Sequence, residues 1–146
     1  MKTFTLTCVL LLSLSLCFTS CKKDNEADPE NPLVGTWAEL DLTAASRSIN
    51  FTKDKIFNLS IGYSNGGGTL ISGTYTLEGD RLKTKSLEMR EQQPGMNMVK
   101  SAANGEIYEN ATFGISGDIL TLKYTTYPAD APVSTTARFK KGLNID

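Results

Sequence analysis

The stretch Tyr75–Lys85, YTLEGDRLKTK, decides the fold expected of this chain. Apolar and polar residues alternate on both sides of Gly79-Asp80, which is the pattern of two antiparallel strands joined by a tight turn. The pattern returns 38 residues later in Phe113–Lys123, FGISGDILTLK. Glycine can take the positive φ that tight hairpin turns require. Two hairpins are therefore predicted, and shared turn chemistry explains their similarity better than a duplication.

Alternation with a period of two also dominates the rest of the chain after about Pro32, and no window has a helical period. We predict eight strands, at Val34–Leu42, Arg47–Phe51, Lys55–Ile61, Thr69–Leu77, Arg81–Met89, Glu106–Ile115, Ile119–Tyr127 and Val133–Lys140. Eight short strands with short connections favour an all-β, antiparallel up-and-down barrel, because closure removes exposed sheet edges.

Two connections need interpretation. The glycine-rich Ser64–Gly68 lacks the Gly-Lys-Ser/Thr ending of a phosphate-binding loop, so we interpret it as a hairpin connection. Arg90–Gly105 is predicted to be a long connection. Its methionines, Met96 and Met98, either fill gaps in the packing, which we favour, or form a mobile lid over an apolar ligand.

The first 20 residues have the pattern of a signal peptide, with Lys2 ahead of an apolar run, Phe4–Phe18. This run is shorter than the roughly 20 residues of a membrane-spanning helix. The residues that follow, Thr19-Ser20-Cys21, resemble the lipobox of bacterial lipoproteins, which implies that Cys21 is diacylated on its sulfur and becomes the acylated N-terminus of the mature chain. The alternative is a plain secretory cut that leaves an unmodified thiol.

Both other cysteines lie in the expected leader, so the mature chain has no intramolecular disulfide. Two or three acyl chains hold a protein stably on a membrane. Residues 21–31 contain no large apolar side chain and read as a flexible tether, which leaves residues 32–146 as one domain. The run Cys21–Glu26 also resembles the export signal of Bacteroidota lipoproteins, which implies an outer-membrane location with surface exposure left open.

Composition excludes several classes of site. Removing the leader takes away one lysine, so the mature chain has 14 basic and 16 acidic residues and no general field for nucleic acid or anionic lipid. The chain has no histidine, which excludes Ser-His-Asp and Cys-His sites and most zinc sites. We therefore expect no enzyme activity, no metal and no cofactor. Glu39, Asp41 and Glu109 are the one carboxylate set compatible with glycoside hydrolysis, and nothing fixes their separation.

The domain begins with Leu33-Val34-Gly35-Thr36-Trp37, and Gly-x-Trp on a first strand resembles the signature of lipocalins. This resemblance implies that Trp37 plugs the closed end of a barrel and that Arg138, near the last strand, stacks across it. The lipobox, the acidic tether, Phe51-Thr52-Lys53-Asp54 and the Gly-Asp hairpins are similar to small lipocalin-like lipoproteins of the Bacteroidota. The resemblance implies a barrel that binds a small ligand.

Strict alternation conflicts with part of this resemblance. It puts Trp37 on one face with Glu39, and it puts Arg138 on the face opposite to Ala137 and Phe139. Either a bulge shifts the register near Trp37, or the interior of the barrel is partly charged. Alternation also puts Glu109 among apolar residues, unless a short or bulged strand leaves it at the rim, which we favour.

These patterns predict a small set of ligand-binding residues, namely Phe57, Tyr75, Tyr124, Glu39 and Glu109. The set suits an apolar pocket with a few polar groups. We expect a lipid-anchored protein that binds a small apolar or amphipathic molecule. The alternative is an interaction module, in which the interior is filled and the outer surface binds a protein or glycan, since an eight-stranded barrel permits either.

Overall fold

The structure, a computed structural model, describes residues 31–128 and 131–142. The predicted leader, Cys21 and nearly all of the tether lie outside these residues. Nine antiparallel strands are present in the described chain: β1 (Gly35–Glu39), β2 (Ala45–Phe51), β3 (Ile56–Tyr63), β4 (Gly68–Glu78), β5 (Arg81–Gln92), β6 (Val99–Gly105), β7 (Glu109–Ser116), β8 (Ile119–Thr126) and β9 (Val133–Lys141). None of the described residues forms a helix long and apolar enough to cross a membrane.

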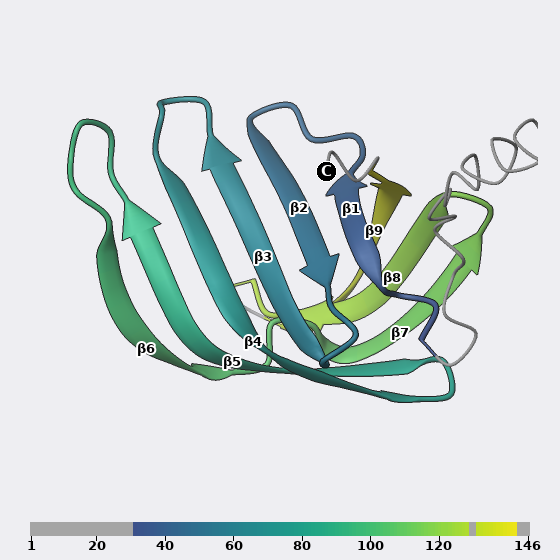
Figure 1. Ribbon diagram of the computed structural model, residues 1–146. Coiled ribbons are helices and arrows are strands. Elements are labelled where there is room, and N and C mark those ends of the chain that lie inside the picture. The colour runs from purple at the N-terminus through teal and green to yellow at the C-terminus, as the bar shows by residue number, and fades with distance from the viewer. Residues whose placement is uncertain (1–30, 129–130, 143–146) are drawn as a thin grey trace, which may run out of the picture.

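Eight of the strands close into an up-and-down barrel, as predicted (Figure 1). Each strand from β1 to β5 pairs with the next, β5 pairs with β7, and β9 returns to β1. The junction of β5 with β7 is short, with Arg81 opposite Thr112 and Leu82 opposite Ala111. The barrel is therefore closed near this junction and free to widen beyond it.

The two Gly-Asp motifs form the predicted hairpin turns. Glu78 pairs with Arg81 around the first turn, and Ser116 pairs with Ile119 around the second. Gly79 has φ 64° and Gly117 has φ 60°. Positive φ at the first of two turn residues matches the right-handed twist of the flanking strands, and this explains why both motifs begin with glycine.

The prediction of a long connection at Arg90–Gly105 is wrong, because most of these residues form strands. The first of them extend β5, and Val99–Gly105 forms β6, which among the described strands pairs with β5 alone. Met96 and Met98, near the tip of this hairpin, are both more than half exposed, so they do not fill gaps. The pattern of small residues in β6 gave no alternation from which the sequence could predict a strand.

One end of the barrel, which we call the closed end, is filled with side chains. Trp37 is buried there and donates a hydrogen bond from its indole nitrogen to the Leu33 carbonyl oxygen, at 2.7 Å. The core around Trp37 consists of Leu33, Ile49, Phe51, Phe57, Leu59, Tyr75, Leu82, Tyr108, Ala111, Leu120, Leu122, Tyr124, Ala137 and Phe139. This core buries fifteen apolar residues, and removing their surface from water is the main force that stabilises the fold.

The chain enters the barrel at the closed end. Asn31, predicted to be the last residue of the tether, is only 3% exposed, so the packed domain begins at least one residue earlier than predicted. Its side-chain amide donates to the Tyr75 hydroxyl at 2.7 Å, and that hydroxyl donates to the Thr52 carbonyl oxygen at 2.8 Å. These bonds join the entering chain to the β2–β3 turn.

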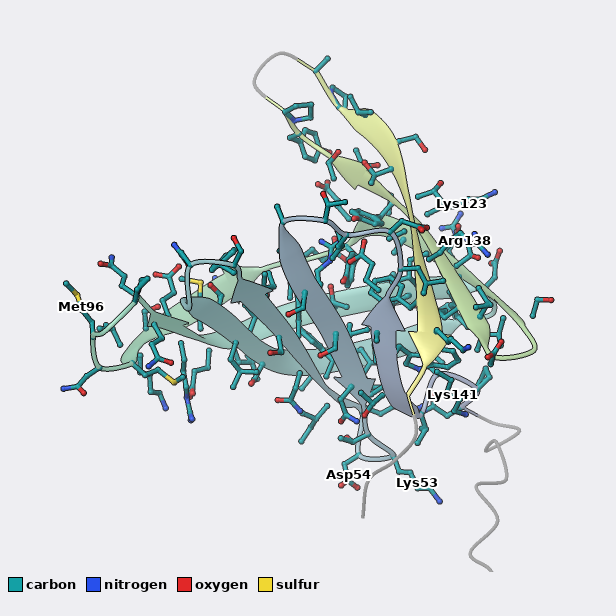
Figure 2. All side chains as sticks on the ribbon, turned by 90° about the horizontal axis from the view of Figure 1, so that it is seen from above. Lys53, Asp54, Met96, Lys123, Arg138 and Lys141 are labelled. Atoms are coloured by element: carbon teal, nitrogen blue, oxygen red, sulfur yellow. The ribbon has the colours of Figure 1, made fainter. Side chains whose placement is uncertain are left out.

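The opposite end is flared. Figure 2 shows the β5–β6 hairpin, with Met96 near its tip, and the β8–β9 hairpin pointing in different directions from the body of the barrel. The reason is that β5 leaves β7 after Leu82 and continues alongside β6. The inner face of β2–β6 is consequently uncovered at this end, which we call the open end.

Candidate functional site

A single row of side chains crosses the inner face at the open end, and we call it the mouth row. Strand register places Arg47 opposite Ile61, Ile61 opposite Thr69, Thr69 opposite Glu91 and Glu91 opposite Val99. A salt bridge from Arg47 to Glu39 extends the row to β1. Exposure rises along the row toward β6, and Val99 is 67% exposed. The row therefore leads from a buried polar base to an accessible rim.

Glu39 and Arg47 form the base of the mouth row. The Arg47 guanidinium donates from both Nε and Nη2 to the two carboxylate oxygens of Glu39. The side chains are 7% exposed for Glu39 and 25% exposed for Arg47. The register of β1 with β2 is continuous around Trp37, so there is no bulge, and the partly charged interior is the correct one of our two alternatives. A buried carboxylate is tolerated here because it is paired.

Tyr108 lies beside this pair, and the sequence did not point to it. A register shift between Glu109 and Thr112 accompanies a positive φ of 52° at Asn110. The bulge reverses the expected faces: Tyr108 is 1% exposed in the core, whereas Glu109 pairs with Thr125, on the face opposite to buried Tyr124. Asparagine tolerates positive φ, but that preference alone does not locate a bulge.

The Tyr108 hydroxyl is buried and has no hydrogen-bond partner among the described residues. Its ring contacts Tyr124 edge to face, with 4.9 Å between the ring centroids. Burial raises the pKa of Tyr108 above its usual value, so the hydroxyl keeps its proton. The hydrogen bond to Glu39 raises the pKa of Arg47, which stays charged. The base of the mouth row is thus a set of hydrogen-bond donors around a neutralised ion pair.

An apolar wall adjoins this base. Leu59 pairs with Ile71, and Ile71 pairs with Met89, in the row next to the mouth row. Ile61, Ile71 and Met89 are all partly exposed. Their side chains share the inner face with Arg47, since directly opposed residues of antiparallel strands point to the same side. Donors and apolar surface therefore meet on one concave face.

The other predicted ligand residues are placed elsewhere. Tyr75 and Phe57 belong to the closed end, where Phe57 is fully buried and the Tyr75 hydroxyl bonds to Asn31 and Thr52. Glu109 lies partly exposed on the outer face of β7, and its hydrogen bond raises the pKa of the exposed Tyr127. Of the five predicted residues, the structure brings together Glu39 and Tyr124, while Tyr75, Phe57 and Glu109 do not join them.

The expectation that Arg138 stacks across Trp37 is wrong. Arg138 is exposed, and alternation places it on the outer face between buried Ala137 and Phe139. Lys141 takes the position across Trp37, with its Nζ 5.4 Å from the ring centroid. Gly35 is where the resemblance implies it to be, with φ 129°, and a Cβ atom there would lie 3.3 Å from Cε of Lys141. Glycine thus leaves room for the lysine that covers the tryptophan.

Two shallow grooves lie near these features. One of about 240 Å³ is at the rim of the open end, between the β3–β4 and β5–β6 hairpins, and its lining includes Tyr63, Thr69 and Glu91. The other, of about 250 Å³, follows the junction of β5 with β7 beside Arg81 and Asn110. Each is smaller than the 300–1,000 Å³ that is common for drug-sized ligands. Both grooves lie on the surface of the described chain, and the first of them adjoins the open face.

In the described chain, no three Cys, Asp or Glu side chains gather in a group that could hold a metal ion. The sequence did not point to three residues of the candidate site and the closed end, namely Arg47, Tyr108 and Lys141. Arg47 had a signal, because it alternates with Ile49 and Phe51. No family model matches this chain, and neither a curated protein nor a solved structure does.

Proposed function

We propose that this protein is a lipid-anchored, non-catalytic lipoprotein of the cell envelope that binds a small amphipathic molecule on the open face of its barrel. One observation carries the binding part: the buried Tyr108 hydroxyl, which has no partner among the described residues, lies beside the Glu39–Arg47 pair at the base of the mouth row. Unsatisfied buried polar groups are costly, and proteins keep few of them without a reason.

The chemistry of the base suggests the kind of ligand. Tyr108 offers a proton, and Arg47 has further N–H groups beyond those that hold Glu39. Because Glu39 already neutralises Arg47, a neutral acceptor such as an ester or amide carbonyl suits the site better than a free anion. The apolar part of the ligand would lie on Ile61, Ile71 and Met89.

Native mass spectrometry tests this proposal. The chain from Cys21 onward, with Cys21→Ser, contains every described strand and carries no acyl group. We expect a molecule of low mass to co-purify with it, and we expect a fluorescent fatty-acid ester to displace that molecule. Purification without any such molecule, together with no binding of the ester, would refute the carrier function.

The anchor is tested separately. The Thr19-Ser20-Cys21 sequence supports acylation of Cys21 and, with the following tether, an outer-membrane location that includes the cell surface as an alternative. Cys21→Ala is expected to abolish incorporation of labelled palmitate and to leave an unprocessed or soluble product. A Cys21→Ala protein that still fractionates as a mature membrane protein contradicts the lipidation.

A second candidate is an interaction module with a filled barrel, and β6 favours it. Among the described strands β6 pairs with β5 alone, and its first residue, Val99, is exposed. Free strand edges can pair with an extended segment of another chain. A protein that binds no small molecule but captures an extended peptide along β6 would support this alternative.

A further inference from the structure

The basic residues of the described chain gather on one side of the barrel, which we call the basic side. It comprises the outer faces of β8 and β9, the start of β5, the β2–β3 turn and, at the closed end, Lys141, which faces inward over Trp37. Nine of the twelve Lys and Arg residues in 31–128 and 131–142 belong to it: Lys53, Lys55, Arg81, Lys83, Lys85, Lys123, Arg138, Lys140 and Lys141.

Fewer acids accompany them. Of the ten described Asp and Glu residues, five lie on this side, namely Asp54, Glu78, Asp80, Glu106 and Asp118. The basic side therefore has a net charge of +4, while the other described residues, three basic and five acidic, have −2. The almost neutral net charge of the whole chain conceals this asymmetry.

Register shows how the cations are spaced. Arg81, Thr112 and Lys123 are directly opposed on β5, β7 and β8, which puts Arg81 and Lys123 two strands, or about 10 Å, apart on the outer surface. Arg138 pairs with Thr121 on the same face, one step along the strand from Lys123. Small neutral threonine side chains lie between these cations, so no bulky or acidic side chain separates them.

Lys123 and Arg138 are free to bind an external anion. Both side chains are exposed, and within the described chain neither has a carboxylate at ion-pair distance. By contrast, Lys100 and Arg90 on the β5–β6 hairpin are both paired with Glu88. Figure 2 shows Lys123, Arg138, Lys141 and Lys53 on the side of the molecule away from Met96 and the β5–β6 hairpin.

The basic side includes the closed end, where buried Asn31 brings the chain into the barrel. A lipid anchor at Cys21, ten residues before Asn31, would hold this end near a bilayer. We propose that the basic side docks on the phosphate groups of anionic phospholipids, so that the open end faces away from the membrane. This inference rests on the proposed anchor for its setting, whereas its charges are those of the barrel itself.

Vesicle binding without the anchor separates the two proposals. The chain from Cys21 onward with Cys21→Ser is mixed at low ionic strength with vesicles of phosphatidylcholine, with or without phosphatidylglycerol, and sedimented. We expect the protein to bind only to the vesicles that contain phosphatidylglycerol. Added salt should abolish this binding, because it screens exposed charges. Failure of the anchor would show instead as missing palmitate on Cys21 and would leave this result unchanged.

Two double variants of equal net charge locate the docking surface. Lys123→Gln with Arg138→Gln should weaken vesicle binding by about 25-fold, since each basic side chain near an anionic surface contributes roughly fivefold. Arg90→Gln with Lys100→Gln removes the same charge from the β5–β6 hairpin and should change binding less than about twofold. Circular dichroism checks that both fold. Equal losses in the two variants, or no binding of the parent chain to anionic vesicles, would overturn the proposal.

Discussion

Lys141 lies over Trp37, with its Nζ 5.4 Å from the centroid of the indole ring, while Arg138 is exposed on the other face of β9. The contact follows from register, because Trp37 and Lys141 are directly opposed on β1 and β9. A cation on the last strand therefore covers Trp37, as the resemblance implies. It is Lys141 and not Arg138, because alternation along β9 lets Lys141 face inward.

Replacing Lys141 should cost more than replacing Arg138. We expect Lys141→Ala to lower the free energy of unfolding by about 1 kcal/mol, through loss of the cation–π contact and of the stem that covers Trp37. Arg138→Ala should stay within about 0.5 kcal/mol of the parent, as exposed substitutions usually do. Urea unfolding measures both, and the opposite ranking would restore the role that the family resemblance implied for Arg138.

Breaking the Glu39–Arg47 pair should destabilise the protein. Arg47→Ala leaves the nearly buried Glu39 carboxylate without its partner, and we expect a loss of about 3 kcal/mol. Replacing both, as Glu39→Leu with Arg47→Leu, should recover much of this loss, because no unpaired charge is left. Urea unfolding of Glu39→Leu, Arg47→Leu and the double variant measures the coupling. If the double variant loses as much unfolding free energy as the two single variants together, the two side chains are not coupled in the way the structure shows.

Tyr108 should make stability fall at alkaline pH. Its pKa is raised in the folded state by burial, so its contribution is present below the ordinary tyrosine pKa of about 10 and is lost as pH rises toward the folded value. Near pH 11 this amounts to about 1 kcal/mol. We expect Tyr108→Phe to unfold at a higher urea concentration, relative to the parent, at pH 11 than at pH 8. An equal difference at both pH values contradicts the shift.

Gly73 should not tolerate a side chain. It lies at the register shift between β4 and β5, where a Cβ atom would meet the carbonyl oxygen of Lys85 and come within 2.8 Å of the Phe57 ring. We expect Gly73→Ala to cost about 3 kcal/mol or more, since the backbone must move.

The matched control for Gly73 is Gly114→Ala. Gly114 is also within a strand, and a Cβ atom added there meets nothing within 4 Å. This variant should unfold at or above the urea midpoint of the parent, because glycine in a strand interior is unfavourable. A Gly73→Ala protein as stable as Gly114→Ala would mean that β4 and β5 are not as close as the structure places them.

Much of this fold was predictable because its signals are local. Alternation and the Gly-Asp turns at Gly79 and Gly117 specify hairpins, and closure follows from the number of strands. Alternation also put Glu39 on the inner face. The strand β6 escaped prediction because Ser101, Ala102 and Ala103 have no apolar alternation, so its pairing with β5 supplies what its own side chains do not.

The site was less predictable because it depends on one bulge. A single extra residue around Asn110 exchanges the faces of Tyr108 and Glu109, which precede the bulge, because a shift by one residue reverses the faces on one side of it. The position of such a bulge is decided by packing between strands that are far apart in the sequence. The predicted Glu109 and the observed Tyr108 are neighbours in the chain but lie on opposite faces of β7.

The most direct test of the open-face site compares two identical changes at two buried tyrosines. Tyr108→Phe removes a hydroxyl beside Arg47 that has no partner in the described part of the chain, whereas Tyr75→Phe removes a hydroxyl that bonds to Asn31 and Thr52 at the closed end. Stability should fall by about 1–3 kcal/mol in Tyr75→Phe and stay level or rise in Tyr108→Phe.

The deciding measurement is the affinity of a fluorescent fatty-acid ester for these two variants and the parent, by titration at neutral pH. We predict that Tyr108→Phe binds the ester about tenfold more weakly, through loss of one buried hydrogen bond, and that Tyr75→Phe binds it as the parent does. Unchanged affinity in Tyr108→Phe, with a loss in Tyr75→Phe, would contradict a ligand site at the open end.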